Sequence, residues 1–499
     1  MSDNLAYTPA AEIASRIRRR DLSPVEAVDY FFDRIDKINP ILNAFIILWH
    51  EDARERAKDA EKAVMKGEEL GPLHGVPIAI KDLFDFRKGF VNTFGAKPLA
   101  NFIAPVSSPY VERLENAGAI ILGKTNTPEF GHKGVTDNLL FGPTSTPFKI
   151  GKNAGGSSGG SASAVAAGLT PIAQGSDGGG SIRIPASWCN VYGYKASYGR
   201  VPNVMRPNAF GSHTPCIHAG PITRTVEDAA LMLSVMGGTH SRDPFSLPND
   251  SSDYVAATKQ SIKGMRIAYS PNWDIWPVDE EISTIVAEAV QGFKDAGAEV
   301  EEVKIGITHD QYELSQIWVR QTAGLYAAAV LDFKKNGIDL LGEHEKDIPS
   351  QLTDVFRMGM KATGLQQSED AIIRSEVFDA IQDVFEKYDF LVTPTLAAMP
   401  VDNASDGVTL GPAAINGVKI DRCIGWCMTY LLNFTGHPAA SIPSGLSRTG
   451  LPVGMQIIGR RFDDAGVLAA SAAFERVRPW AHTYSGIEDG IVPKPPEHF

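Results

Sequence analysis

The sequence predicts an α/β protein with an open, mixed β-sheet flanked by helices on both faces. Helical charge patterns alternate with short apolar runs along most of the chain, an arrangement typical of sheets with many parallel strands. A mainly helical stretch at about 310–390 interrupts the alternation, which then resumes. The 43% share of hydrophobic residues is ordinary for a globular protein, and 499 residues can bury a large core.

The N-terminal helices are expected within residues 8–67. One of them begins with Ser23-Pro24-Val25-Glu26, which combines a capping box with proline at the first helical position. Asn39-Pro40 should end it, because the residue before a proline disfavours the helical conformation. Helices are expected at 8–20, 23–38, 50–67, 108–118, 160–168, 182–189, 225–236, 280–296 and 463–477. Strands are expected at 44–48, 76–80, 119–122, 171–174, 266–269, 298–303, 390–393, 439–442 and 453–458.

Composition limits the classes of partner. The net charge of −12 and the pI near 5.5 argue against direct nucleic-acid binding, which calls for a basic stripe, although an RNA held by another subunit stays open. The N-terminus lacks a basic and then apolar leader, and no run of eighteen apolar residues occurs, so we expect a cytoplasmic protein without membrane contact. A homodimer is an open alternative. No linker-like stretch divides residues 1–499, which favours a single domain.

Metal and redox chemistry find no pattern in the sequence. The four cysteines include no CxxC pair, and Cys423 and Cys427 are best interpreted as small buried hydrophobes on a helix. No HExxH, Walker-type or dinucleotide-binding glycine motif is present. We therefore expect no metal site and no cofactor.

Two clusters of glycine and serine at Gly155–Pro185 are the most unusual feature of the chain. Glycine destabilises regular structure by roughly 0.5–1 kcal/mol relative to alanine, so seven of them indicate turns that need a special backbone or a close approach. Within the first cluster, Gly155-Gly-Ser157-Ser-Gly159 fits the GxSxG nucleophile elbow of α/β-hydrolases. That alternative needs a strand before the motif, and Phe148–Ala154 is a poor one.

Lys81 is the candidate general base. It ends the apolar run Val76–Ile80, so it starts from a buried position, where desolvation lowers the pKa of an ammonium. A shift of roughly 3.4 units would make it neutral at pH 7, within the range seen for buried lysines. A solvated strand tip is the ordinary alternative.

Ser181 is the candidate nucleophile. It directly follows Gly178, Gly179 and Gly180, whose N–H groups can form a nest for a developing oxyanion, worth roughly 3–4 kcal/mol per donor. Asp177 and Arg183 flank this turn and are expected to hold it by hydrogen bonds or an ion pair.

These motifs closely resemble those of the amidase signature family. The resemblance rests on Gly75–Asp82, Gly155–Ser161, Gly175–Pro185, Gly220–Ala230, Val392–Thr395 and Gly450–Arg460, in that order along the chain. It implies a single amidase domain over 1–499, with a catalytic core at about 70–240 and a helical region at about 310–390 that covers the substrate. It departs from the family pattern at Ser176, where threonine is usual, and at Gly178, where threonine or isoleucine is common; the latter either enlarges the cleft or loosens the turn.

The resemblance also implies a Ser–cis-Ser–Lys triad of Ser181, Ser157 and Lys81. Ser181 would attack the amide carbonyl and pass its proton through Ser157 to neutral Lys81, with Ser157 following a cis peptide bond. Backbone N–H groups of Gly178, Gly179, Gly180 and Ser181 would hold the oxyanion. Water would then hydrolyse the acyl-serine.

Three functions follow for comparison with the structure. The first is an amidohydrolase that cleaves a small-molecule carboxamide, with Trp426 and Tyr430 as expected pocket residues and a mild preference for hydrophobic acyl groups. The second is the glutaminase (A) subunit of a tRNA-dependent amidotransferase complex. The third is a non-catalytic binding protein, against which retention of all three triad residue types argues.

Overall fold

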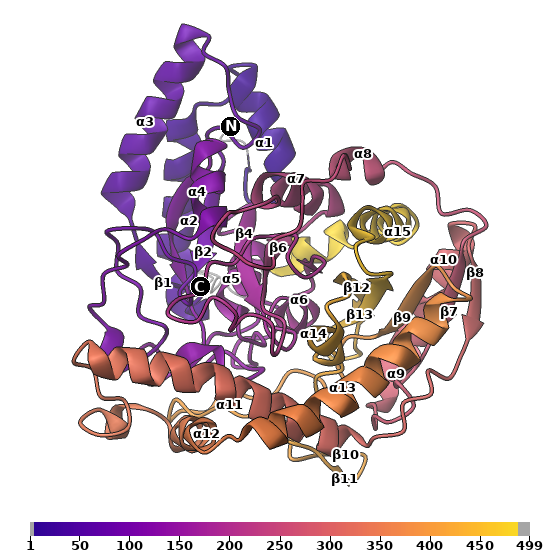
Figure 1. Cartoon of the computed structure of the whole chain (residues 1–499). Helices are drawn as coiled ribbons and strands as arrows, with labels where there is room; N and C mark the ends of the chain where they lie inside the picture. Colours follow the sequence, from indigo (N-terminus) through magenta and orange to yellow (C-terminus); the bar gives the residue numbers. More distant parts are fainter. Residues whose placement is uncertain (1–3, 488–499) are drawn as a thin grey trace, which may run out of the picture.

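A computed structural model describes residues 4–487 of the chain. Within that range eleven strands form one sheet, in the order β1-β3-β2-β4-β6-β5-β12-β13-β9-β7-β8 (Figure 1). The strands are β1 Phe45–Leu48, β2 Pro77–Lys81, β3 Ile120–Thr125, β4 Ile172–Asp177, β5 Tyr192–Lys195, β6 His218–Thr223, β7 Arg266–Tyr269, β8 Glu299–Glu302, β9 Phe390–Pro394, β12 Ala439–Leu446 and β13 Pro452–Gly459. A small separate hairpin joins β10 Ala414–Ile415 and β11 Val418–Lys419.

Helices lie against this sheet and along one side of the molecule. They are α1 Ala10–Arg18, α2 Pro24–Leu42, α3 His50–Lys66, α4 Pro109–Asn116, α5 Gly159–Ala166, α6 Arg183–Trp188, α7 Val226–Met236, α8 Tyr254–Ala257, α9 Glu280–Ala289, α10 Gln291–Asp295, α11 Gln311–Lys335, α12 Ser350–Met360, α13 Gly364–Phe385, α14 Leu431–Thr435 and α15 Asp464–Val477. Four short 3₁₀ helices are Lys97–Leu99, Glu129–Gly131, Glu345–Asp347 and Ala481–Gly486. In the part of the chain that is described, no helix is long and apolar enough to cross a membrane.

The sheet is mixed, as the sequence predicts. Parallel pairs join β2 to β3 and β4, and β7 to β8 and β9. Antiparallel pairs run through the middle of the sheet, from β4 through β6, β5, β12 and β13 to β9. Two parallel regions are thus joined by an antiparallel centre.

Two central strands escape the sequence pattern. β5 contains Gly193, and β6 contains Gly220 and Pro221, residues that are normally depleted in strand interiors. Antiparallel pairing of β6 with both β4 and β5 makes them strands. Tertiary contacts, rather than local propensity, decide these elements.

The end of α2 corrects another expectation. The helix continues past Asn39-Pro40 to Leu42 and ends at Asn43, which has a left-handed backbone with φ of 55°. The side-chain oxygen of Asn39 accepts hydrogen bonds from the N–H groups of Ala44 and Phe45, at 2.9 and 2.7 Å. These bonds close the helix end, so proline is accommodated within its last turn.

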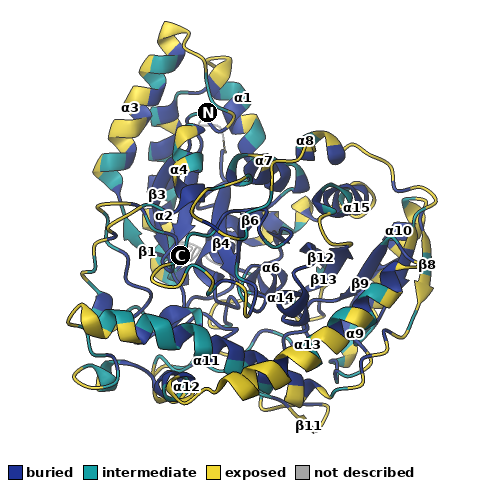
Figure 2. Cartoon of the chain, viewed as in Figure 1, coloured by how far each residue is buried: buried dark blue, intermediate teal, exposed yellow. Residues whose placement is uncertain are grey.

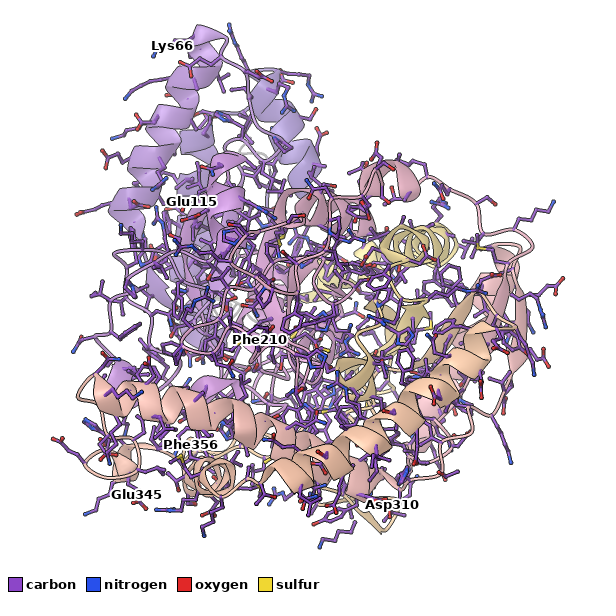
Figure 3. All side chains as sticks on the ribbon, viewed as in Figure 1. Lys66, Glu115, Phe210, Asp310, Glu345 and Phe356 are labelled. Carbon is purple, nitrogen blue, oxygen red and sulfur yellow. The ribbon has the colours of Figure 1, made fainter. Side chains whose placement is uncertain are left out.

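Buried side chains form one large core around the sheet and a second, smaller one. The strands and the inward faces of the helices are buried, while α3 and α13 turn exposed faces outward (Figure 2). The smaller core joins α11 and α12 to the segments around Leu83, Phe94 and Phe130. Phe356 of α12 belongs to it (Figure 3). The helical stretch predicted at about 310–390 therefore has its own packing against the rest of the molecule.

Candidate active site

Two neighbouring parallel strands bring the candidate residues to one edge of the sheet. Lys81 is the last residue of β2, and Asp177 is the last residue of β4. These strands pair in parallel through Ile78 and Ala79 of β2. Carboxyl ends of parallel strands open at the same edge, which is where ligands bind in open α/β sheets. Residues 96 positions apart in sequence thus become neighbours.

Lys81 is fully buried and hydrogen-bonded to two hydroxyl groups. Its ammonium nitrogen lies 2.7 Å from Ser157 Oγ and 3.0 Å from Ser176 Oγ. Burial lowers its pKa to about 7, although the carboxylates of Asp85 and Asp177 act in the opposite direction. At neutral pH a large fraction of Lys81 is therefore uncharged and able to accept a proton.

A second layer of polar groups surrounds the end of β2. Asp85 is fully buried, and its Oδ1 accepts hydrogen bonds of 2.6 Å from both Tyr110 and Gln174. Lys124, also buried, donates to the main-chain oxygen of Lys81 at 3.0 Å. The sequence analysis did not single out these groups; their only sequence signal is that charged residues directly follow or end predicted apolar strands.

Ser157 lies in the first glycine cluster, just before α5. The peptide bond between Gly156 and Ser157 is cis, as the resemblance implies. No strand forms at 148–154, so the motif lacks the strand that a nucleophile elbow requires. The hydroxyl of Ser157 pairs with a lysine and not with a histidine. The α/β-hydrolase interpretation is therefore not supported.

Ser181 lines the same pocket from the second glycine cluster. Its side chain is half-buried, and within residues 4–487 its hydroxyl makes no hydrogen bond to the protein. The N–H of Ser158 donates to the main-chain oxygen of Ser181 at 3.1 Å, which joins the two glycine clusters. The structure thus brings Lys81, Ser157 and Ser181 together.

The glycine turn before Ser181 presents only some of its N–H groups. The N–H of Gly180 donates to Asp177 Oδ1 at 2.8 Å, so it is already engaged. In the described part of the chain, no protein acceptor binds the N–H groups of Gly178, Gly179 or Ser181. The expected set of four donors therefore reduces to three that are free.

Side chains from distant elements hold the carbonyl oxygens of this turn. Trp318 Nε1 of α11 donates to the oxygen of Gly178 at 2.8 Å, and Thr429 Oγ1 donates to that of Gly179 at 2.6 Å. Because the C=O and N–H of a trans peptide point in opposite directions, fixing the Gly178 oxygen also directs the N–H of Gly179 away from Trp318.

Asp177 and Arg183 form a fully buried ion pair behind the turn. Arg183 contacts both carboxylate oxygens, at 3.0 and 2.9 Å, and also donates to Asn433 Oδ1 and Gln456 Oε1 at 2.8 Å. Burial alone would raise the pKa of Asp177, but the adjacent guanidinium holds that pKa below its usual range. Asp177 therefore stays ionised and anchors the N–H groups of Gly180 and Ile182.

The pocket over the two serines is narrow and mainly apolar. Its lining residues in the described structure include no charged side chain. They are Leu83, Phe84, Phe130, Gly131, Ser157, Ser176, Gly178, Ser181, Pro215, Ile217, Trp318, Thr322, Leu325 and Tyr326. In the same part of the chain, no three His, Cys, Asp or Glu side chains are grouped as metal ligands.

The expected pocket residues Trp426 and Tyr430 lie elsewhere. Both are fully buried: Trp426 stacks on Trp188 with ring centres 4.6 Å apart, and Tyr430 donates to the main-chain oxygen of Gln311 at 3.1 Å. Neither lines the pocket. Trp318 and Tyr326 of α11 form its wall instead, at helical spacing that in the sequence is indistinguishable from core.

Comparisons with known proteins agree on one family. The Amidase family model matches residues 26–468. An acylamidase of Rhodococcus erythropolis is 38% identical over 480 residues, covering 96% of this chain and 97% of that protein. The crystal structure of a bacterial aryl acylamidase of the amidase signature family is 45% identical and superposes with a TM-score of 0.95, covering 98% and 99% of the two chains. A subunit of the glutamyl-tRNA(Gln) amidotransferase of Thermodesulfovibrio yellowstonii is 34% identical, covering 94% of this chain and 97% of the relative.

Proposed function

This chain belongs to the amidase signature family, and from that premise we propose that it hydrolyses aryl amides through Ser181, Ser157 and Lys81. It is an amidase, a hydrolase of carbon–nitrogen bonds in small-molecule amides. The observation that carries the proposed mechanism is the 2.7 Å hydrogen bond between a fully buried Lys81 and Ser157, in the pocket that Ser181 lines.

Neutral Lys81 starts the reaction by accepting a proton. It deprotonates Ser157, which in turn takes the hydroxyl proton of Ser181 as Ser181 Oγ bonds to the amide carbon. The carbonyl π electrons move to the oxygen. Two hydroxyl-bearing residues thus conduct one proton to a base that itself never touches the substrate.

The developing oxyanion is bound by backbone N–H groups of the glycine turn. We assign this role to Gly178, Gly179 and Ser181, whose N–H groups have no protein acceptor among the described residues. Gly180 supports the turn through Asp177. Donors held in place before the reaction stabilise the transition state without reorganisation.

The proton then travels back to the leaving amine. Protonated Lys81 returns it through Ser157 to the amide nitrogen, the carbon–nitrogen bond breaks, and the neutral amine departs. A water molecule, deprotonated by the same relay, attacks the acyl-serine, and Ser181 recovers its proton as the carbon–oxygen bond breaks.

The pocket chemistry favours an aryl amide over glutamine. Its walls are aromatic and aliphatic, with Phe130, Trp318 and Tyr326 among them, and it contains no charged side chain in the described structure. The α-ammonium and α-carboxylate of glutamine would lose hydration there without a charged partner. A flat aromatic group instead buries apolar surface. The glutaminase alternative is therefore the less supported one.

A hydrolysis panel tests this function. Purified protein is incubated with acetanilide, an aliphatic amide, glutamine and 4-nitrophenyl acetate, and product formation is followed for wild type and Ser181→Ala. We expect wild type to hydrolyse the anilide faster than glutamine, and Ser181→Ala to lose at least about 1,000-fold in kcat. Wild-type turnover by Ser181→Ala would contradict the mechanism.

The ester provides a control for the role of Lys81. A 4-nitrophenolate leaves without protonation, whereas an aniline needs a proton. Lys81→Ala should therefore lose more activity on acetanilide than on the ester. Equal losses on both substrates would argue against the return of the proton from Lys81.

A further inference from the structure

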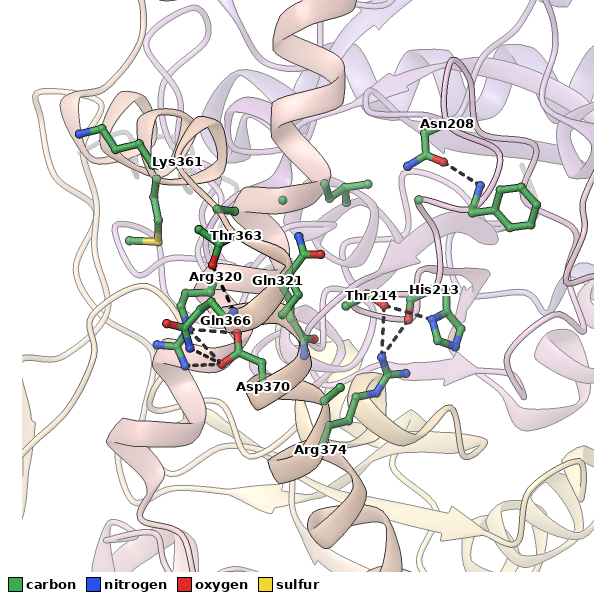
Figure 4. Close-up of a pocket in the computed structure, with 18 residues that line it drawn as sticks. Asn208, His213, Thr214, Arg320, Gln321, Lys361, Thr363, Gln366, Asp370 and Arg374 are labelled. Carbon is green, nitrogen blue, oxygen red and sulfur yellow. Dashed lines mark hydrogen bonds and ion pairs between the residues drawn. The ribbon is translucent and has the colours of Figure 1, made fainter.

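A second cavity of about 590 Å³ lies beside the catalytic pocket. It is enclosed by the segment 208–214 on one side and by α11, the start of α13 and the turn between α12 and α13 on the other (Figure 4). The two pockets share the side chain of Leu325. Consecutive residues, Gln321 and Thr322, line one pocket and the other. A substrate in the catalytic pocket thus has a large continuation around Leu325.

Gln321 is the group in this cavity whose hydrogen bonding is unmet. The residue is only 7% exposed, and its Oε1 is shielded and has no partner among the described residues. Its Nε2 likewise makes no hydrogen bond to the described protein. Leaving one such buried group unsatisfied costs about 1–3 kcal/mol, so a whole amide at the wall of an open cavity points to a bound polar group.

The charged side chains around Gln321 are already paired. Arg320 forms an ion pair with Asp370 at 2.6 Å, and Gln366 donates to the same carboxylate at 3.4 Å. Arg374 donates to the main-chain oxygen of His213 at 3.2 Å and to Cys216 Sγ at 3.3 Å, besides the oxygen of Phe434. Since these groups bind protein atoms, the free capacity is that of a neutral amide.

We propose that this cavity is a subsite for the part of the substrate beyond the scissile amide, where Gln321 binds an uncharged hydrogen-bonding group such as a second carboxamide. An amide can both accept from Gln321 Nε2 and donate to its Oε1, which an alkyl group or a carboxylate cannot do. A neutral group also enters this partly dry site without the desolvation cost of a charge. This inference rests on the proposed amide hydrolysis.

Two matched substrate series test it, because the extension could lie on either side of the scissile bond. On the acyl side, heptananilide is compared with the anilide of adipic acid monoamide. On the amine side, 4-propylacetanilide is compared with 4-(carbamoylmethyl)acetanilide. In one series we expect wild type to prefer the carboxamide by about tenfold or more in kcat/KM.

Gln321→Leu should remove this preference while acetanilide itself is hydrolysed at the wild-type rate. The control Gln316→Leu, on the same helix but outside the cavity, should keep the preference. If wild type shows no preference in either series, or Gln321→Leu retains it, the subsite assignment is overturned. A stronger preference for the matching carboxylate would overturn the assignment of an uncharged group.

Gly324→Leu is a second variant that does not depend on Gln321. A Cβ at Gly324 would meet only Gln367 Nε2, at 3.7 Å, so a leucine there extends into the cavity without a clash. Leucine also favours a helix over glycine. It should lower kcat/KM about tenfold or more for the preferred carboxamide substrate and leave acetanilide unaffected. Unchanged rates on both would contradict the subsite.

The controls separate this inference from the proposed function. Ser181-dependent hydrolysis of acetanilide without any carboxamide preference would refute the subsite alone. Absence of Ser181-dependent hydrolysis on every substrate would instead refute the function.

Discussion

The ammonium group of Lys81 lies in a fully buried site whose hydrogen-bond partners are the hydroxyls of Ser157 and Ser176. Hydroxyl groups can bind the neutral amine as well as the ammonium, because each can donate or accept. The charged form therefore gains no dedicated counter-ion to offset burial, and the pKa falls to about 7. This is the property that lets a lysine act where most enzymes use histidine.

The pH dependence of kcat/KM follows from this pKa. Below about pH 7 Lys81 is protonated and cannot accept the proton of Ser157, so kcat/KM should fall with decreasing pH. Above about pH 7 the neutral form dominates, and the rate should level off. The measurement is kcat/KM on acetanilide across the pH range in which the protein stays folded. An acid limb centred near pH 10 would show that Lys81 is not desolvated.

Asp85 is expected to hold the pKa of Lys81 up from an even lower value. Its carboxylate favours the ammonium form, so Asp85→Asn should shift the acid limb of the kcat/KM profile to lower pH, by roughly 1 unit. Asp82→Asn is the matched control, because the carboxylate of Asp82 accepts from the N–H of Thr93 at 2.9 Å. Neither variant changes a residue that contacts the substrate.

A shift of the limb to higher pH in Asp85→Asn would contradict this assignment, as would equal shifts in both variants. Because a structural defect lowers the rate at every pH, the position of the limb distinguishes tuning of Lys81 from damage to the fold.

At the scale of elements, the glycine turn is shaped by what packs on it. A Cβ at Gly179 would lie 2.7 Å from the indole of Trp318, and one at Gly180 would overlap Thr429. Gly180 also has φ of +123°, which L-residues rarely adopt. At Gly178 a Cβ would meet only the end of Ile217, a flexible side chain. The departure from the family pattern at Gly178 therefore opens space and is not needed for the turn.

Paired alanine substitutions test this distinction. Gly179→Ala should displace the indole that fixes the Gly178 carbonyl, and so disturb the oxyanion donors; we expect a loss of about 100-fold in kcat. Gly178→Ala should cost less than about tenfold, because Ile217 can move aside.

The kinetics of both variants are measured on acetanilide, with circular dichroism as a check of folding. Equal losses in the two variants would mean that the turn tolerates no side chain anywhere, contrary to the packing at Gly178.

At the scale of the whole molecule, the catalytic residues and the pocket wall belong to different cores. Lys81 and Asp177 end strands of the central sheet, whereas Phe130 and Tyr326 are members of the smaller core that includes α11 and α12. Phe356 is nearly fully buried there, and its ring meets those of Phe130 and Tyr326 at 5.6 and 5.7 Å. The shape of the pocket thus depends on packing outside the sheet.

Phe356→Ala should loosen the pocket wall without disrupting the sheet. Removing a buried phenylalanine costs about 3–5 kcal/mol where the site cannot collapse. We expect faster amide hydrogen exchange in α12 and the adjoining turn of α11, and a higher KM for acetanilide. Exchange in β4 and β13 should stay unchanged, and global unfolding instead of a local effect would contradict the separation of the two cores.

The fold class and the identity of the reactive residues were available from the sequence alone. Apolar runs and helical charge patterns are local signals, and they predict most strands and the helical stretch at about 310–390. The glycine–serine clusters and the lysine after an apolar strand are local signals as well. They name Lys81, Ser157 and Ser181, whose catalytic roles stay predictions until the substitutions above are measured.

Only the tertiary structure decided what surrounds those residues. β5 and β6 become strands through pairing, and Gly180 is withdrawn from the free donors by Asp177, a contact that depends on turn geometry. Trp318 and Tyr326 replace Trp426 and Tyr430 at the pocket because helix packing, and not residue type, sets which aromatic faces the cavity. Chemistry is recorded in short motifs, whereas a pocket is assembled from residues far apart in the chain.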